Sequence, residues 1–408
     1  MKAVIMAAGD GIRLKPLTNT RPKVMLYVAG KPILWHIIME AKKAGITEAI
    51  VIVRYLKDKV IDYFKKNDPG IRIAFLEQSK KNGTAEAILT AKDQIKDTFV
   101  VLAGDTITDS NIIKQVISEH KTGQITMALK EVKNPKNYGV VEVDKQNRVV
   151  LMEEKPEKPS SNLVNLSIYC MDPTIFSEIK NISKSERGEY EITSLLVGAR
   201  GVIAKGFWMD IGSPWNLFEA NEYLLGKMNA QLGEIQDSTI NGKVIMEEGA
   251  KIIHSYVEGI SYIGKNTVIG PNAYLKGNNS IGDDCNIGSG STVKNSILFD
   301  KVNAKHLTYI GDSVIGEDVN FGAGSQIANY RFDADNIKVY TERGWINTGL
   351  KKFGCVVGDN TKFGVLSFVM PGKLIGNDCW VGSGVEVNKN IEPKTKVLLK
   401  QEIVFVKD

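Results

Sequence analysis

The first half of the chain alternates short apolar runs with amphipathic segments of helical periodicity. The apolar runs at residues 3–8, 49–53 and 99–103 are uninterrupted, as in parallel strands that are buried on both faces, and residues 71–76 are predicted to form another strand. Helices are predicted at residues 33–44 and 57–66, and a third opens at Gly83-Thr84-Ala85. This alternation predicts an open, mostly parallel α/β sheet, whose ligands bind beyond the carboxyl ends of the strands.

The second half repeats an apolar residue followed by glycine every six positions. The repeat begins at Ile263-Gly264, ends at Val381-Gly382, and is interrupted near residues 299–309 and 331–355. One apolar side chain per short strand fills a narrow core, so the pattern predicts a left-handed parallel β-helix. Loops are expected to leave the coil at the two interruptions. A meandering β-sandwich is the alternative, but it does not require a constant six-residue period.

A polar stretch near residues 226–242 separates the two patterns. We therefore expect a first domain at residues 1–228, a linker at 229–245, and a β-helix domain with a C-terminal tail at 246–408.

Charge and cysteine usage narrow the class of protein. The net charge of +5 suits anionic small substrates and does not indicate binding to nucleic acid or membrane. The four cysteines are far apart and form no Cys-x-x-Cys pair, which is typical of buried thiols in a reducing compartment. No apolar run is long enough for a membrane span or signal peptide, so a cytoplasmic protein is expected.

The first apolar run leads into a loop with Gly9 and Gly11, followed by Arg13 and Lys23. A glycine turn after a strand exposes backbone N–H groups, and nearby cations can neutralise a polyphosphate. Leu14 stands where a dinucleotide-binding fingerprint has its third glycine, and no Gly-Lys-Ser/Thr follows for a P-loop. The loop is therefore predicted to hold a triphosphate in another way.

Two carboxylates are candidate ligands for Mg²⁺. Asp105 follows the strand at residues 99–103, and Asp210 lies between an aromatic segment and Gly212. Mg²⁺ prefers hard oxygen ligands and shares them with phosphates. Each aspartate could instead be a cap or turn residue; Ser213 is expected to cap a helix that runs to about Met228.

Further polar residues lie between the two aspartates. Glu154 suits a sugar hydroxyl, the neighbouring Lys155 suits a sugar phosphate, and Gly139 leaves room for a ligand beside its strand. Asn165 interrupts an apolar strand, where it could bind the sugar or could be a core residue bonded to the backbone.

These segments resemble the signature of sugar-1-phosphate nucleotidylyltransferases over about residues 1–228. The resemblance implies a Rossmann-like domain in which a sugar phosphate attacks the α-phosphorus of UTP or dTTP and pyrophosphate leaves. In that family a glutamine at the base-reading position goes with uracil or thymine. The implied roles are triphosphate binding by Gly9, Gly11, Arg13 and Lys23, base reading by Gln78 and Gly83, Mg²⁺ binding by Asp105 and Asp210, and sugar-phosphate binding by Gly139, Glu154, Lys155 and Asn165.

The six-residue repeat resembles hexapeptide acyltransferases, which are usually trimers. Residues 305–312 and 320–330 further resemble the acetyltransferase half of archaeal-type bifunctional enzymes that make UDP-N-acetylglucosamine. The resemblance implies acetylation of an amino-sugar 1-phosphate by acetyl-CoA, with His306 on a loop as general base, because an imidazole titrates in the right range. The implied acceptor-binding residues are Lys294, Tyr309 and Asn320, and the implied acetyl-CoA-binding residues are Ala323, Asn329 and Tyr330.

Two other hypotheses remain open at this point. The chain could be a thymidylyl- or uridylyltransferase whose β-helix only forms a trimer or regulates it; Gln78 argues against a guanylyltransferase. It could also be a non-catalytic subunit, although Arg13, Lys23 and Asp105 are all present.

Overall fold

The computed structural model describes residues 1–79, 83–185, 188–229 and 232–406, and it divides into two compact units. The first unit comprises Met1–Asp10, Pro22–Met25 and Pro32–Asp210. The second unit comprises Gly11–Arg21, Leu26–Lys31 and Ile211–Asp408, so part of the N-terminal loop belongs to the same unit as the β-helix. The predicted boundaries at residues 228 and 245 stay a prediction, and residues 230 and 231 of the predicted linker lie outside the described residues.

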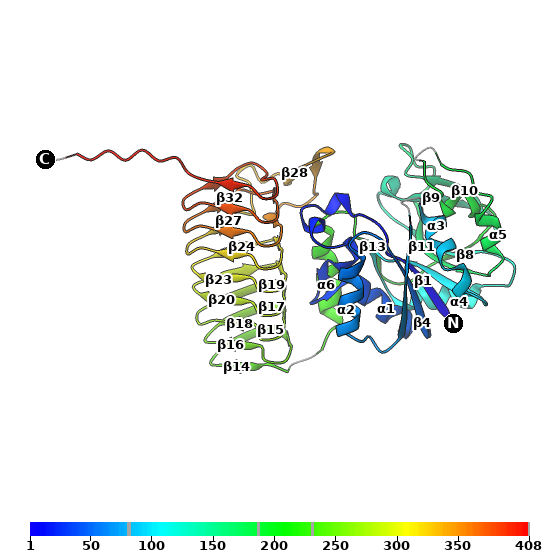
Figure 1. The fold of residues 1–408 in the computed structure, drawn as a ribbon, viewed down its shortest axis with the longest axis horizontal. Coiled ribbons are helices and arrows are strands. Elements are labelled where there is room, and N and C mark those ends of the chain that lie inside the picture. The colour runs from blue at the N-terminus through cyan, green and yellow to red at the C-terminus, as the bar shows by residue number, and fades with distance from the viewer. Residues whose placement is uncertain (80–82, 186–187, 230–231, 407–408) are drawn as a thin grey trace. The chain divides into compact units, whose positions relative to one another are not determined.

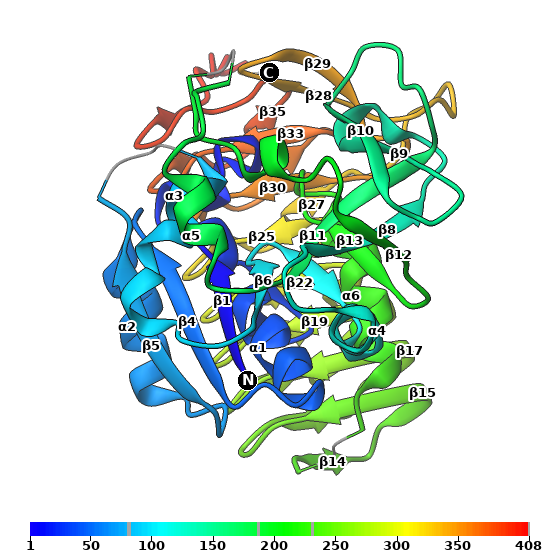
Figure 2. The same cartoon turned by 90° about the vertical axis from the view of Figure 1, so that its right-hand side faces the viewer.

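A mixed sheet forms the centre of the first unit (Figure 2). Its order is β10-β9-β11-β6-β1-β4-β5, with β8 beside β11 and β12 beside β8. Strands β1, β4, β5 and β6 are parallel, and β11 runs antiparallel to β6. The bounds are β1 Lys2–Met6, β4 Glu48–Val53, β5 Arg72–Glu77, β6 Phe99–Ala103, β8 Thr126–Glu131, β9 Gly139–Val143, β10 Val149–Glu154, β11 Leu163–Met171 and β12 Arg200–Ile203. The predicted open α/β sheet is confirmed.

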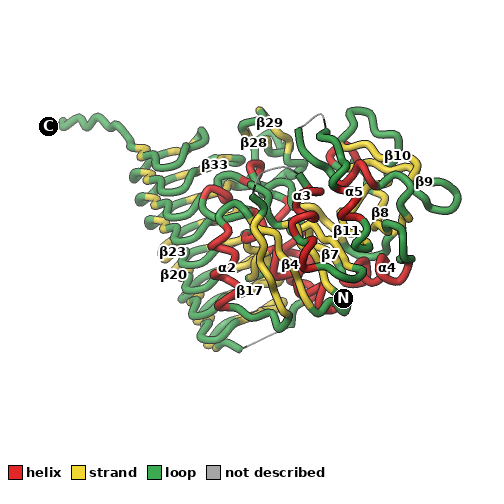
Figure 3. The backbone as a smooth tube through the Cα atoms, turned by 45° about the vertical axis from the view of Figure 1, so that its right-hand side comes forward, coloured by secondary structure: helices red, strands yellow, loops and turns green. Residues whose placement is uncertain are grey.

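Helices cover this sheet (Figure 3); α1, α2 and the start of α3 lie where the sequence predicts helices, and the structure adds α4 and α5. Their bounds are α1 Ile33–Lys43, α2 Lys57–Lys66, α3 Thr84–Thr90, α4 Ser110–Glu119 and α5 Ile175–Ile179. The apolar faces pack on fully buried strand residues; for example, the rings of Phe99 in β6 and Phe176 in α5 stack with centroids 5.5 Å apart. Uninterrupted apolar strands and one-sided helices therefore make a layered core, and polar side chains collect at the strand ends.

A short antiparallel pair links two distant parts of the first unit. Strand β7 (Thr106–Thr108) pairs with β13 (Trp208–Asp210), and Thr106 lies opposite Asp210. This register places Asp105 and Asp210, which are far apart in sequence, beside one another after the end of β6.

The second unit contains a coil of parallel strands that rises from β14 to β36 (Figure 1). One sheet contains β14 Glu234–Gln236, β16 Lys251–Ile253, β18 Val268–Ile269, β20 Asn286–Ser289, β23 Asn303–His306, β26 Asn320–Phe321, β31 Lys362–Phe363, β34 Trp380–Val381 and β36 Lys396–Val397. The other sheet contains β15 Thr239–Met246, β17 Tyr256–Ile263, β19 Tyr274–Ile281, β21 Thr292–Lys294, β22 Ile297–Leu298, β24 Tyr309–Gly311, β25 Val314–Ile315, β27 Gln326–Ile327, β30 Cys355–Val357, β32 Phe368–Val369, β33 Lys373–Ile375 and β35 Glu386–Val387.

The repeated apolar residue of each coil points inward. Leu275 lies opposite Val293, which lies opposite Ile310, and all three are fully buried in one apolar column. The predicted parallel β-helix is confirmed. Strands β14 and β15 already belong to the coil, so we propose that the repeat begins near residue 234, within the stretch predicted as a linker.

The first predicted interruption of the coil is wrong. Strand β23 lies within residues 299–309, and its Ala304 is buried in the apolar column. The step from Val293 to Ile310 is one residue shorter than the step from Leu275 to Val293. The coil therefore continues with a shortened turn, which shifts the sequence period without ejecting a loop.

The second predicted interruption is confirmed. Residues 331–354 leave the coil and carry a hairpin of β28 (Lys338–Thr341) and β29 (Gly344–Asn347), after which β30 resumes the stack beside β25. The hairpin is visible beside the top of the coil in Figure 1.

Helix α6 (Asn216–Lys227) belongs to the second unit. Its residue Leu225 packs against Ile245 and Tyr262 of the coil. The expected cap at Ser213 is wrong, because Trp215 occupies the N-cap position. The backbone N–H of Ser213 instead donates to Oδ1 of Asn216 at 2.8 Å, so this residue orients the chain before the helix.

Candidate functional sites

Lys23 and two carboxylates converge in the first unit. Lys23 is buried, and its Nζ lies 2.6 Å from Oδ2 of Asp105 and 3.6 Å from Oδ1 of Asp210. The β7–β13 register holds both aspartates, and Asp105 follows directly after β6. Two carboxylates that approach one ammonium are close enough to share a cation, and their oxygens are the ligands that Mg²⁺ prefers.

Substrate phosphates are needed to complete such a metal site. Within the part of the chain that the structure describes, no group of three or more His, Cys, Asp or Glu side chains could hold a metal ion. Mg²⁺ commonly keeps one or two protein carboxylates and takes its other ligands from water and phosphate. The pair of Asp105 and Asp210 fits that donor set.

Gln78 and Gly83 lie together at the end of β5. The buried side chain of Gln78 donates from Nε2 to the carbonyl oxygen of Gly83 at 3.2 Å. Gly83 has φ +94°, and a Cβ there would come within 2.5 Å of the Tyr190 carbonyl oxygen. A side chain at position 83 is therefore excluded, and the backbone stays close to the carboxamide of Gln78.

The predicted sugar-binding residues also gather in the first unit. Gly139 in β9 lies opposite Glu154 in β10, and a Cβ on Gly139 would lie 3.1 Å from Oε2 of Glu154 and 3.7 Å from Cβ of Asn165. Lys155 pairs with Glu154 at 3.2 Å and has a positive φ of 52°. A carboxylate, an ammonium and an amide therefore surround one glycine.

The side chain of Asn165 is already bonded within the protein. Its Oδ1 accepts from the backbone N–H of Ser167 at 2.9 Å, and its Nδ2 donates to the Tyr169 hydroxyl at 2.7 Å. Burial raises the pKa of Tyr169 to about 12, so this hydroxyl stays protonated at neutral pH. These bonds fix the orientation of the amide, whose second N–H is the group that could reach a ligand.

The residues of the N-terminal loop fall in different units. Gly9 is in the first unit, and a Cβ added to it would meet no atom within 4 Å, so the space above its backbone is open. Gly11 and Arg13 are in the second unit, where Gly11 has φ +67° and its carbonyl oxygen accepts from the Thr18 hydroxyl at 2.9 Å. Arg13 is exposed.

In the coil, Asp312 gathers several of the predicted residues. Asn329 donates from Nδ2 to Asp312 and also to the Tyr309 hydroxyl, the latter at 3.1 Å. The ammonium of Lys294 lies 3.4 Å from Oδ2 of Asp312. A hollow of about 390 Å³ is lined by Lys294, Tyr309, Asn329, Tyr330 and Lys352. Asp312 is buried and fixes one amide and one cation at the wall of this hollow.

His306 and Asn320 lie on a different sheet of the coil from this cluster. His306 ends β23, and its exposed side chain precedes Leu307, whose φ of 51° turns the chain. The prediction that His306 sits on a loop leaving the coil is wrong, because the carbonyl oxygen of His306 accepts from the N–H of Gly324 in the next coil at 3.1 Å. Asn320 in β26 pairs with Asn303 and Lys362, and Ala323 lies in the following turn.

Asp312 and the hollow's lining residue Lys352 had no role assigned from the sequence. Asp312 follows Ile310-Gly311 and reads as an ordinary corner residue, although an aspartate that is buried at a corner requires partners. Lys352 is close to Tyr330 only because the end of the hairpin insertion bridges back to that residue. The spacing of the sequence contains no signal for that contact.

All four cysteines are free, buried thiols. Burial raises the pKa of Cys170, Cys285 and Cys355 to about 12, which keeps these groups protonated and poorly nucleophilic. Among the described residues, no helix is both long and apolar enough to cross a membrane.

The geometry agrees with the comparisons to known proteins. The family described as "Nucleotidyl transferase" matches residues 2–227, and the family described as "GMPPB C-terminal domain" matches residues 257–363. The "Bifunctional protein GlmU" of Methanocaldococcus jannaschii is 41% identical, and the match covers 100% of both chains. The "Bifunctional sugar-1-phosphate nucleotidylyltransferase/acetyltransferase" of Sulfurisphaera tokodaii is 39% identical over 96% of this chain and 98% of its own.

A solved structure of a UDP-glucose pyrophosphorylase in complex with UDP-glucose is similar to the first part of the chain. It is 26% identical, has a TM-score of 0.51, and the match covers 56% of this chain and 99% of the other. The chain belongs to the nucleotidyl transferase family, in the group of bifunctional enzymes that join a nucleotidylyltransferase to a β-helical acetyltransferase.

Proposed function

We propose that the protein transfers a nucleotidyl group from UTP or dTTP to a sugar 1-phosphate of the glucose or N-acetylglucosamine type. A phosphate oxygen of the sugar forms a bond to the α-phosphorus, and the bond to pyrophosphate breaks. The observation that supports this most directly is the approach of Asp105 and Asp210 to the buried ammonium of Lys23.

The protein's part in this reaction is to position two anions. Lys23 and Arg13 offset the negative charge of the triphosphate and of the departing pyrophosphate, and Gly9 and Gly11 leave backbone N–H groups accessible. Asp105 and Asp210 would hold Mg²⁺, which neutralises charge that develops on the phosphate oxygens. Gln78, held beside Gly83, would accept from and donate to the edge of a pyrimidine.

The sugar 1-phosphate would bind among the residues that surround Gly139. Glu154 accepts from sugar hydroxyls, Lys155 faces the phosphate, and the oriented amide of Asn165 donates its remaining hydrogen. The absence of a side chain at position 139 is required, because Met152 and Glu154 already occupy the space that a Cβ needs.

We propose that the coil acetylates an amino-sugar 1-phosphate. His306 would take a proton from the ammonium form of the amine, the neutral nitrogen would attack the thioester carbon of acetyl-CoA, and CoA would leave as its thiol. Lys294 and Tyr309 would bind the acceptor phosphate and hydroxyls, with Asn320 as a further contact. Ala323, Asn329 and Tyr330 would border the acetyl-CoA.

These roles favour a homotrimer. His306 and Asn320 lie in one sheet of the coil, whereas Lys294 and Tyr309 lie in the other sheet. A site that uses both faces of a coil is completed more readily between two copies of the chain than within one, and three equivalent contacts close a ring. We also propose a reducing, cytoplasmic compartment, because all four cysteines are free.

Two assays on purified protein test both activities. The first measures pyrophosphate release from a panel of nucleotides and sugar 1-phosphates with Mg²⁺, and the second measures free CoA thiol with acetyl-CoA and amino-sugar 1-phosphates. Asp105→Asn should lower only the first activity, and His306→Ala only the second. His254→Ala is the matched control, since His254 is another exposed histidine of the coil.

If His306→Ala retains full acetyl transfer, His306 is not the general base. If GTP is the best substrate, the proposed recognition of a pyrimidine base by Gln78 is wrong. Pyrophosphate release without any acetyl transfer would favour the alternative in which the coil is only a trimerisation or regulatory domain.

A further inference from the structure

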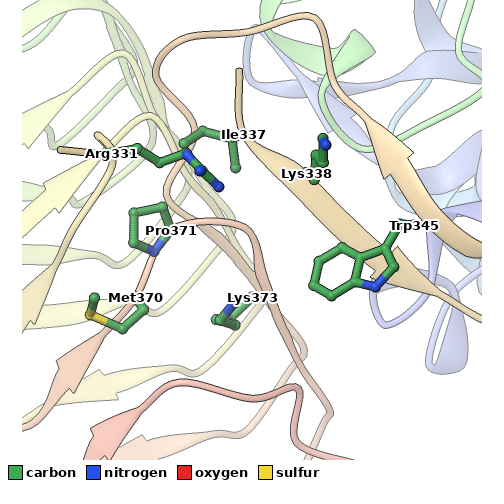
Figure 4. A pocket seen from close by; sticks show the side chains of 7 residues that line it. All are labelled: Arg331, Ile337, Lys338, Trp345, Met370, Pro371 and Lys373. Carbon is green, nitrogen blue, oxygen red and sulfur yellow. The ribbon is translucent and has the colours of Figure 1, made fainter. Parts of the chain in front are cut away.

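We propose that a basic pocket on the 331–354 insertion binds the phosphoadenosine end of coenzyme A. The pocket lies in the second unit, has a volume of about 520 Å³, and is lined by Arg331, Ile337, Lys338, Trp345, Met370, Pro371 and Lys373 (Figure 4). This inference deepens the proposed acetyl transfer and rests on it, and it assigns a role to an insertion that the sequence analysis left without one.

The hairpin forms one wall of the pocket. Tyr340 lies opposite Trp345, and Lys338 lies opposite Asn347, so Lys338 and Trp345 project from the same face of the hairpin. The neighbouring Ile337 and Val339 are buried and anchor β28. Figure 4 shows Trp345 on the hairpin across the pocket from Arg331 and Pro371.

The coil forms the opposite wall. The chain turns at Gly372, which has φ +76°, and a Cβ there would lie 2.6 Å from the carbonyl oxygen of Lys338. This close approach holds residues 370–373 against the start of β28. Both walls therefore rest on buried or tightly packed backbone, and the pocket is already formed without a ligand.

The charges that line the pocket are all positive. Arg331, Lys338 and Lys373 are three of its lining residues, and none of the lining residues is acidic. Within the described residues, neither lysine has a hydrogen-bond or ion-pair partner, and Arg331 is oriented by Asp333, to which its Nε donates at 2.8 Å. Burial lowers the pKa of Lys373, so a bound anion would offset the desolvation of its ammonium. Phosphate groups are the ligands that such a cluster would bind.

The aromatic ring favours a nucleotide over a simple phosphate. Trp345 is 65% exposed, and its only ring contact among the described residues is with Tyr340, at 5.3 Å between centroids and 59° between planes. An exposed indole that lines the pocket and has one tilted ring contact is available for stacking with adenine. Cations beside an open indole therefore match a base that carries phosphates.

The pocket also shares a lining residue with a hollow that borders the proposed acetylation site. Met370 lines both the basic pocket and a neighbouring hollow of about 440 Å³ with Ile327, Ala328 and Phe368. Tyr309 lines that hollow and also the hollow around Lys294 and Asn329.

The three neighbouring hollows thus have, in order, a polar lining, a largely apolar lining that also includes Gln326 and Glu386, and a cationic lining with an aromatic ring. Coenzyme A has the same order of chemistry, since its thioester leads through the pantetheine arm to a diphosphate and a phosphorylated adenosine. An isolated phosphate site would not need the apolar hollow, and a lipid or peptide site would not need two unpaired lysines in a pocket with an exposed indole.

The test compares two acetyl donors on the full-length protein. Acetyl-CoA carries the phosphoadenosine end, and acetyl-pantetheine lacks it. Trp345→Ala and Lys373→Gln should each raise the KM for acetyl-CoA by about tenfold or more, because stacking and phosphate pairing are lost. The KM for acetyl-pantetheine, and pyrophosphate release by the first unit, should stay unchanged.

Two further variants keep the test interpretable. Lys373→Arg retains the charge and should restore most of the affinity for acetyl-CoA. Lys251→Gln removes an exposed lysine from the first part of the coil and should change neither KM. An equal rise in KM for both donors, or no rise for acetyl-CoA, would overturn the proposal.

Calorimetric titration tests binding to this pocket independently of acetyl transfer. CoA and adenosine 3′,5′-bisphosphate should both bind, and Trp345→Ala should weaken both. If the parent protein binds them but transfers no acetyl group, the pocket stands and the proposed function fails. If neither binds, or if UTP competes for this pocket more strongly than CoA, the assignment to coenzyme A is wrong.

Discussion

Asp300 is a buried carboxyl whose charge opposes folding at neutral pH. Its pKa is raised from 3.8 to about 6, mainly by burial and also by the nearby Asp283 and Glu317, while a backbone hydrogen bond and Arg21 act in the opposite direction. That bond runs from the backbone N–H of Asp283 to Oδ1 of Asp300, at 2.8 Å. Asp300→Asn removes the charge and keeps an oxygen that can accept this bond.

The direction of the pH effect follows from proton binding. Between about pH 4 and pH 6 the folded chain holds a proton on Asp300 that the unfolded chain has lost, so stability falls as the pH rises through this window. Above the folded pKa the loss is complete, and a shift of about two units corresponds to roughly 3 kcal/mol. Asp300→Asn should regain up to that amount near pH 8 and almost nothing near pH 4.

Scanning calorimetry of the purified protein at pH 4.5 and pH 8 measures this difference. The melting temperature of the coil should rise by about 5–10 °C for Asp300→Asn at pH 8, with a much smaller change at pH 4.5. Asp284→Asn is the control, since Asp284 is the exposed neighbour of Asp283. An Asp300→Asn effect that is equal at both pH values would refute the reasoning, because it could not arise from the titration of this carboxyl.

Four other outcomes are expected. Gly277→Ala should destabilise the coil by roughly 1–3 kcal/mol, because φ is +76° and the new methyl group would overlap Oδ1 of Asn295; Gly349→Ala, at φ +74° with open space, should cost less in the same denaturation assay. Ile310→Ala should cost about 2–5 kcal/mol, since Ile310 is fully buried in the apolar column. A thiol reagent at pH 8 should label the native protein slowly and the denatured protein fully, as followed by absorbance. Removal of divalent metal by a chelator should stop pyrophosphate release and leave thiol release from acetyl-CoA unchanged.

The fold was largely predictable because both halves carry strong local periods. Uninterrupted apolar strands predicted the parallel part of the sheet, and the apolar-glycine repeat predicted the coil. The helix at Ile33–Lys43 and the strand at Phe99–Ala103 lie where these patterns indicate. The prediction failed where the six-residue period shifts. The shortened turn around Ala304 was predicted to be a loop leaving the coil, because a shift of the period and an inserted loop give the same break in the sequence pattern.

The pairing of site residues could be predicted less well. The end of a strand marks Asp105 and Gln78 as candidates, but only the β7–β13 register brings Asp210 beside Asp105. From the sequence, Asn165 could be either a sugar ligand or a core residue. Its bonds to Ser167 and Tyr169 form where the register of β11 against β8 becomes irregular, between Asn165 and Tyr169.

The sequence by itself determined the layered sheet, the coil and the kinds of chemistry available, because strand burial and coil corners impose residue types at fixed spacings. Tertiary structure decided which of those residues meet. The buried carboxylate of Asp312 collects Lys294 and Asn329 from successive coils, and the hairpin places Trp345 opposite Lys373. Such contacts join segments with no constant separation along the chain, so they follow from strand register and packing and leave no periodic pattern in the sequence.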